Sequence, residues 1–216
     1  MIKKRLFTPG PVSVFPAALS AALEANIHHR TPEFKEVLAE VMAALKRVLG
    51  DPAHAFLFAS SGSGAMEAAV TNFFSAGDPV VVASCGKFGE RWIELTERYA
   101  LNAQVLKYPY GEAVRPEDIE AALKQNPSIR GVFLQACESS TAVQNDVAAI
   151  ARVVANSEGI LVVDAVTGLG TMPISCSMGV DVIVSGSQKA LMIPPGLGLI
   201  GVSQKAWGRV ESATLP

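Results

Sequence analysis

Seven apolar runs of strand length, alternating with stretches of helical periodicity, are the feature that most constrains the fold of this chain. The runs cover residues 55–60, 79–84, 103–109, 131–136, 159–166, 181–187 and 197–203, and most are apolar at nearly every position. Such runs are typical of strands buried on both faces of a sheet. Helical patterns precede or separate them at 31–49, 63–74, 89–100, 115–125 and 145–156. The alternation predicts an α/β fold in which helices cover both faces of a mainly parallel, seven-stranded sheet.

Composition and charge limit the class of partner. The chain has 216 residues, of which half are apolar, and its 18 basic and 20 acidic residues leave a net charge of −2. That balance gives no electrostatic reason to expect binding to nucleic acid or to an anionic membrane. No apolar run approaches the ~20 residues of a membrane span. We therefore expect a cytoplasmic protein whose partner is a small metabolite.

The three cysteines, Cys85, Cys137 and Cys176, are far apart in the sequence. Their spacing fits neither a zinc site nor a disulfide framework, and is typical of reduced thiols. No metal is expected on this basis.

The first strand leads into a stretch of small residues, "SSGSG" at 60–64, at the start of a helix. Small residues let the backbone approach a ligand, and the free N–H groups of a helix start favour a phosphate. A tight strand-to-helix turn would explain the same stretch. It is not a dinucleotide fingerprint, because Glu67 stands where a glycine or alanine is expected.

Polar residues also follow three later strands, at the sheet edge where ligands bind in α/β folds. Asp164 follows four apolar residues, Ser139 lies in "CESSTA", and Lys189 follows 181–187. Each has a simpler explanation, as a cap, a turn residue or a lysine that reaches solvent. Together, however, a phosphate cradle, an acid, hydroxyls and an amine are what pyridoxal phosphate requires. A buried ammonium at Lys189 would otherwise be costly.

Several motifs identify a resemblance to a known family. "TPGP", "HHRTPEF", "SSGSGAMEAA", "CESSTAV", "VDAVTGLG" and "SGSQKALMIPPGLG" occur in the order found in class V pyridoxal phosphate aminotransferases. The chain resembles most the alanine:glyoxylate and serine:glyoxylate (serine:pyruvate) group. This resemblance implies a homodimer that moves an amino group from alanine or serine to a 2-oxo acid such as glyoxylate or pyruvate. It also implies the fold-type I large domain over 31–216, with an N-terminal segment, 1–30, near the entrance of the active site.

The resemblance assigns roles position by position. Lys189 would carry the cofactor as a Schiff base and move a proton, and Asp164 would pair with the pyridine nitrogen. The remaining contacts are Ser61, Gly62, Ser63 and Gln188 with the phosphate, Ser139 with the ring hydroxyl, and Val166 and Phe88 with the two ring faces. An aromatic ring such as that of Phe88 offers the flat apolar surface that this last role needs.

Other residues near these motifs have ordinary explanations. His28 and His29 could line the substrate entrance or lie on the surface. Arg91 is expected to face solvent, and Trp92 to pack in the core. Glu67 could close a helix cap at Ser63 or Gly64.

Three alternatives remain at the level of function. Cysteine desulfurases and related class V lyases usually carry a histidine immediately before the lysine, whereas this chain has Gln188, which favours transamination. Relatives continue into a smaller C-terminal domain that supplies an arginine for the substrate carboxylate, and we expect that domain to be absent here. The chain could therefore bind the cofactor without turnover, or recruit another protein through an exposed surface without catalysis.

Overall fold

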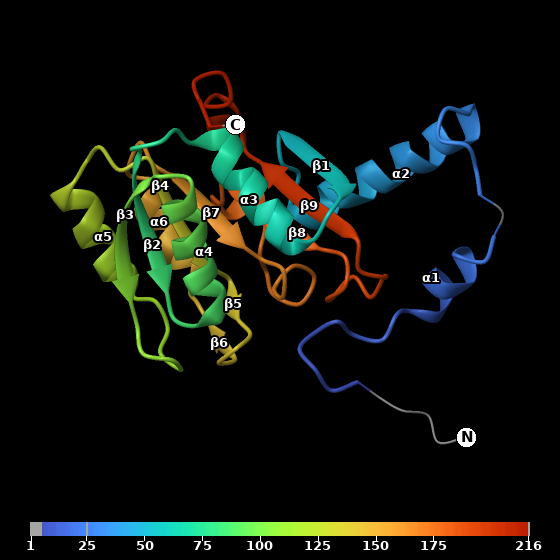
Figure 1. Cartoon of the computed structure of the whole chain (residues 1–216), viewed down its shortest axis with the longest axis horizontal. Coiled ribbons are helices and arrows are strands. Elements are labelled where there is room, and N and C mark those ends of the chain that lie inside the picture. Colours follow the sequence, from blue (N-terminus) through green and yellow to red (C-terminus); the bar gives the residue numbers. More distant parts are fainter. Residues whose placement is uncertain (1–5, 25, 216) are drawn as a thin grey trace.

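The computed structural model describes residues 6–24 and 26–215, and a single seven-stranded sheet organises most of them (Figure 1). The strands are β1 (His54–Ala59), β2 (Pro79–Ser84), β3 (Asn102–Lys107), β4 (Gly131–Gln135), β7 (Ile160–Asp164), β8 (Val182–Gly186) and β9 (Leu197–Val202). Their order across the sheet is β1-β9-β8-β7-β4-β2-β3. The predicted strand count and the mainly parallel direction are confirmed.

Strand β9 runs opposite to both of its neighbours, while β8, β7, β4, β2 and β3 pair in parallel. The connection from β8 to β9 covers residues 187–196 and contains no helix. A parallel connection needs a crossover of a dozen or more residues, usually a helix, so this short loop returns the chain in the opposite direction.

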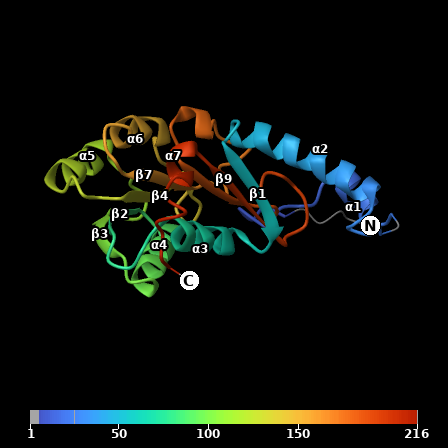
Figure 2. The same cartoon turned by 90° about the horizontal axis from the view of Figure 1, so that it is seen from above.

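Helices cover the two faces of the sheet, as Figure 2 shows from above. Helices α2 (Pro32–Leu49), α5 (Pro116–Gln125) and α6 (Val147–Val154) pack on one face, and α3 (Gly62–Phe73), α4 (Lys87–Arg98) and the short α7 (Gln204–Trp207) on the other. The smaller elements are α1 (Pro16–Ala21), the ribbon of β5 (Cys137–Glu138) with β6 (Val143–Gln144), and the 3-10 turn Cys176–Met178. Among the described residues, no helix is both long and apolar enough to span a bilayer.

Local sequence sets the ends of α2. The Thr31 hydroxyl accepts a hydrogen bond from the N–H of Phe34, and Pro32 occupies the first helical position. Gly50 ends the helix at φ 78°, a left-handed conformation that glycine adopts without a Cβ penalty. The first half of α2 and the whole of α1 project away from the sheet (Figure 1).

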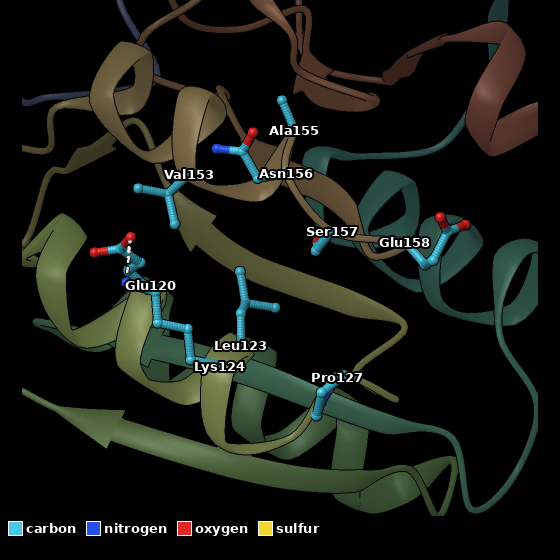
Figure 3. A pocket seen from close by; sticks show the side chains of 9 residues that line it. All are labelled: Glu120, Leu123, Lys124, Pro127, Val153, Ala155, Asn156, Ser157 and Glu158. Carbon is cyan, nitrogen blue, oxygen red and sulfur yellow. Dashed lines mark ion pairs between the residues drawn. The ribbon is translucent and has the colours of Figure 1, made fainter.

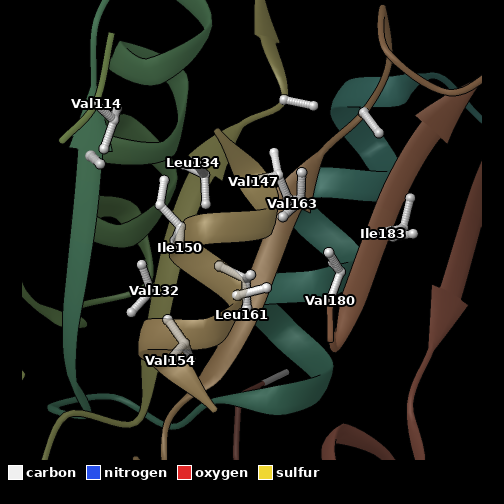
Figure 4. Packing of buried hydrophobic residues seen from close by; sticks show 14 of the residues in the cluster. Val114, Val132, Leu134, Val147, Ile150, Val154, Leu161, Val163, Val180 and Ile183 are labelled. Atoms are coloured by element: carbon white, nitrogen blue, oxygen red, sulfur yellow. The ribbon is translucent and has the colours of Figure 1, made fainter. Parts of the chain in front are cut away.

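Alternate residues along each strand fill a separate core on each face. Figure 4 shows part of the core beneath α6, where Val132, Leu134, Leu161 and Val163 point toward α6 residues such as Ile150. On the opposite face, Phe133 of β4 lies between two aromatic rings, each with its centroid 5.0 Å away: Phe74 and Trp92. Apolar side chains cover both faces, so the carboxyl edge of the sheet is where polar groups gather.

Candidate functional site

A cavity of about 240 Å³ opens at the carboxyl edge of β7 and β8, next to the start of α3. It is lined by Ser61, Gly62, Ser63, Met66, Phe88, Ser139, Asp164, Val166, Thr167, Gln188 and Lys189. All nine residues that the sequence predicts as contacts of a cofactor therefore lie around one cavity. Met66 and Thr167 were not predicted, although Met66 lies on the buried face of α3 and Thr167 directly follows Val166.

A larger cavity of about 550 Å³ lies between the carboxyl ends of α5 and α6 (Figure 3). Pro127, Ser157 and Glu158, on its rim, precede the first residues of β4 and β7, so it lies at the opposite edge of the sheet. Of its three charged lining residues, Glu120 and Lys124 pair with each other at 2.7 Å. We assign the functional site to the smaller cavity, because it alone of the two combines a buried acid, hydroxyls and an amine.

The start of α3 forms one wall of the cavity. The Ser61 hydroxyl caps the helix by accepting a hydrogen bond from the N–H of Gly64 at 3.4 Å. Gly62 must lack a side chain, because a Cβ there would lie 2.5 Å from Cγ2 of Val166. The free N–H groups and the dipole of this first turn favour an anion such as a phosphate.

The predicted alternative for Glu67 is wrong. Its carboxylate accepts a hydrogen bond from the Tyr99 hydroxyl and takes no part in capping α3. The cap is Ser61, which precedes both positions that the sequence suggested, Ser63 and Gly64.

Asp164 ends β7 and lies at the base of the cavity with 5% of its surface exposed. Its Oδ1 accepts a hydrogen bond from the N–H of Val166 at 2.8 Å. The pKa of this carboxyl is raised to about 6, chiefly by burial and also by the Glu138 carboxylate, against the opposing effects of the Val166 N–H, Lys189 and Arg91. A cationic group held in the cavity would restore the charged form of Asp164.

Lys189 follows β8 and lines the cavity. Its ammonium donates a hydrogen bond to the carbonyl of Pro9 at 3.3 Å. The next residue, Gly10, packs so closely that a Cβ there would lie 2.5 Å from Nζ of Lys189. The lysine is half-buried, so the expectation of a buried amine is met only in part.

Two backbone hydrogen bonds hold that segment beside the lysine. The N–H of Val12 donates to the Gln188 carbonyl at 3.1 Å, and the N–H of Phe15 donates to the Met192 carbonyl at 2.7 Å. His28 and His29, from the same segment, are exposed and do not line the cavity.

Glu138 is a residue whose role sequence reasoning missed. It is fully buried, and its Oε2 accepts hydrogen bonds from the N–H groups of Phe88 and Gly89 at 2.9 and 3.0 Å. Its Oε1 accepts from the N–H and the hydroxyl of Ser140. Glu138 thus caps α4 from another part of the chain and fixes Phe88 relative to Ser139. The signal in the sequence was Gly86, which begins α4 without any capping side chain.

Trp92 and Arg91, which are neighbours on α4, were predicted to be a core residue and a solvent-facing residue. Trp92 is buried in the core as predicted, and its indole N–H donates to the Leu134 carbonyl at 3.3 Å. Arg91 is exposed, as predicted. Its guanidinium also donates a hydrogen bond to the Ser63 hydroxyl at 3.0 Å, which was not predicted.

The thiols are not activated. Burial is the main cause that raises the pKa of Cys85 and of Cys137, and it raises that of Cys176 to about 12. All three cysteines are free, and in the described part of the chain no three metal-binding side chains gather at one place.

Comparison with known proteins identifies relatives over the whole chain. A family model described as class V aminotransferase matches residues 14–215. The small subunit of a soluble hydrogenase from Synechococcus sp. (strain PCC 6716) is 42% identical over 99% of this chain and 57% of its own length. L-aspartate–glyoxylate aminotransferase from Paracoccus denitrificans is 38% identical over 98% of this chain and 55% of its own length.

A solved structure, of a subgroup IV aspartate aminotransferase from Thermus thermophilus, superposes with a TM-score of 0.90 at 37% identity. The match covers 96% of this chain and 59% of that one. The chain spans little more than half the length of the relatives it matches.

Proposed function

The chain belongs to the class V aminotransferase family, and we propose that it binds pyridoxal 5′-phosphate in the cavity at the end of β7 and β8. In this proposal the protein moves an amino group from a small amino acid, alanine or serine, to a 2-oxo acid such as glyoxylate or pyruvate. The observation that carries it is the convergence of the nine predicted residues on one cavity. The name of the Paracoccus relative includes glyoxylate, which supports the choice of acceptor.

The residues present fit this cofactor. Burial raises the pKa of the Asp164 carboxyl, because the ionised form loses its contact with water. A protonated ring nitrogen next to this carboxylate would offset that loss, and the two charges would stabilise each other. The start of α3 offers N–H groups and two hydroxyls, of Ser61 and Ser63, to a phosphate. The amine of Lys189 lines the same cavity and is suited to a covalent link with an aldehyde.

Pyridoxal phosphate, when bound, supplies an electron-accepting ring that stabilises negative charge at the substrate α-carbon. The protein supplies the rest. The Lys189 amine would take the proton from the α-carbon and return it elsewhere, as a general base and acid. Asp164 would hold a proton on the ring nitrogen, while Val166 and Phe88 would exclude water from the two ring faces.

Further parts of the proposal rest on the resemblance alone. The chain covers 57% and 55% of the two relatives described above, so the substrates and the assembly of a whole protein are proposals here. We propose a cytoplasmic homodimer, with the large domain over 31–216 and residues 1–30 near the entrance. The contacts of Pro9, Val12 and Phe15 with the loop after β8 support the position of that segment.

The alternatives differ in what supports them. A desulfurase-like lyase needs a reactive thiolate, which is disfavoured by the raised pKa values of all three cysteines and by Gln188 before the lysine. Binding of the cofactor without turnover, and recruitment of another protein without catalysis, are outcomes of the test below. The name of the Synechococcus relative describes that protein, and no arrangement of side chains in the cavity favours it for this chain.

The test is an amino-transfer assay with the chain loaded with pyridoxal phosphate. Alanine, serine and aspartate are offered in turn with glyoxylate, and glycine formation is measured by chromatography. We expect glycine from alanine or serine, and none from the Lys189→Ala variant. Cofactor binding without glycine would favour the binding domain over the enzyme. Failure to bind the cofactor would contradict the proposal.

A further inference from the structure

The cofactor phosphate proposed above would meet mostly neutral donors in this cavity. Ser61, Ser63 and Gln188 carry no charge, and the start of α3 contributes only about half of a positive charge. A phosphate group carries −1.5 to −2 at pH 7, as an approximate range. Lys189 cannot serve as its permanent partner if its amine is used in the covalent link. A cation beside these neutral donors would therefore strengthen the binding of the phosphate.

We propose that Arg91 of α4 is the counter-ion of the cofactor phosphate, and that it makes the site selective for the phosphorylated cofactor over pyridoxal. This inference rests on the proposed function, and it assigns a role to a residue that does not itself line the cavity. The observation behind it is the hydrogen bond that the Arg91 guanidinium donates to the Ser63 hydroxyl at 3.0 Å.

Ser63 lines two separate cavities. It lines the cavity at the end of β7, and it also lines a groove of about 830 Å³ between α3 and α4, to which Arg91 contributes. The two helices lie side by side in both views (Figures 1 and 2). The guanidinium therefore stands on the groove side of the hydroxyl that the phosphate would contact from the cavity side.

Most N–H groups of the Arg91 guanidinium are available to a ligand. In the described part of the chain, no carboxylate lies within ion-pair distance of Arg91, and its bond to Ser63 uses one of five N–H groups. Its charge already reaches the cavity, because Arg91 is among the groups that lower the pKa of Asp164. An arginine fork matches the geometry of a phosphate and would form strong, charge-assisted hydrogen bonds.

The position of Arg91 is fixed by the structure of α4. Phe88 and Arg91 are three residues apart, so they lie on the same side of the helix. Glu138 anchors the first turn of α4 through the N–H groups of Phe88 and Gly89. The same anchor that sets the ring of Phe88 at the cavity thus directs Arg91 toward Ser63.

The experiment compares dissociation constants for pyridoxal phosphate and for pyridoxal, which lacks the phosphate, in the wild type and in three variants. Arg91→Gln removes the charge, and Arg91→Lys keeps a charge without the fork. Arg98→Gln is the matched control, because Arg98 lies two turns further along α4 and lines the same groove. Binding is followed by absorbance, and thermal unfolding confirms that each variant folds.

We expect Arg91→Gln to weaken the binding of pyridoxal phosphate roughly 10- to 100-fold, which is the range for losing a charge-assisted hydrogen bond. Pyridoxal should bind all four proteins alike, Arg91→Lys should be intermediate, and Arg98→Gln should match the wild type. If Arg91→Gln binds pyridoxal phosphate as tightly as the wild type does, or if it weakens the binding of both ligands equally, the inference is wrong and the proposed function stands. If the wild type binds neither ligand, both fail.

Discussion

Asp164 should destabilise the cofactor-free protein at neutral pH, and replacing it with asparagine should therefore stabilise the fold. The pKa of the buried carboxyl rises from 3.8 to about 6 on folding. The folded state therefore binds the proton more tightly than the unfolded state, and the free energy of unfolding falls as pH rises between these two values. At 1.36 kcal/mol per pKa unit, ionised Asp164 costs about 3 kcal/mol above pH 6.

Asp164→Asn removes this cost while keeping an oxygen that can accept from the Val166 N–H. The new amide N–H₂ is buried, which offsets about 1 kcal/mol of the gain or more. We expect the variant to be about 1–2 kcal/mol more stable than the wild type at pH 7.5, and no more stable at pH 4, where Asp164 is largely protonated.

Urea unfolding of both cofactor-free proteins at the two pH values measures the difference. A variant that is less stable at both, or that shows the same difference at both, would refute the reasoning. With cofactor the order should change, because a cationic ring nitrogen favours the ionised carboxyl. Pyridoxal phosphate should stabilise the wild type more than the variant, and amino transfer in the variant should slow by roughly 10²-fold or more.

Three further substitutions test separate parts of the account. Gly62→Ala places a methyl group 2.5 Å from Cγ2 of Val166, so it should weaken cofactor binding measured by absorbance. An unchanged affinity would show that Val166 moves aside without affecting the cofactor site. Glu138→Gln replaces one carboxylate oxygen with an NH₂ donor, so either the N–H groups of Phe88 and Gly89 or the N–H of Ser140 lose their acceptor, which should cost about 1–3 kcal/mol of stability in urea. An unchanged midpoint would argue against the cap. Phe133→Ala empties the space between two aromatic rings and should cost about 3–5 kcal/mol by the same measurement, whereas a loss below about 1 kcal/mol would mean that the core collapses around it.

The sheet and the cavity could be predicted because they follow from local patterns. Buried strands such as β7 and β8 are apolar at nearly every position, and parallel strands bring their carboxyl ends to one edge. Asp164 and Lys189 could therefore be placed together from the residues that follow those strands. The antiparallel direction of β9 also follows from its short connection to β8, which is visible in the sequence as the interval between the last two apolar runs.

The contacts that were missed depend on distances in space. Glu138 caps α4 from 49 and 50 residues away in the chain, and Arg91 reaches Ser63 across 28 residues. A helical pattern shows which side of α4 is polar, but not which neighbour that side meets. The partial exposure of Lys189 likewise depends on how the segment around Pro9 packs against it.

The central claim is that this cavity holds pyridoxal phosphate through Lys189. The most direct measurement is borohydride reduction of the chain with bound pyridoxal phosphate, followed by peptide mapping with mass spectrometry. The Lys87→Ala variant is the control, because Lys87 is an exposed lysine one residue from Phe88. We predict a label on the peptide that contains Lys189, retained in Lys87→Ala and lost in Lys189→Ala. A label on another lysine, or one that survives in Lys189→Ala, would contradict the assignment of the site.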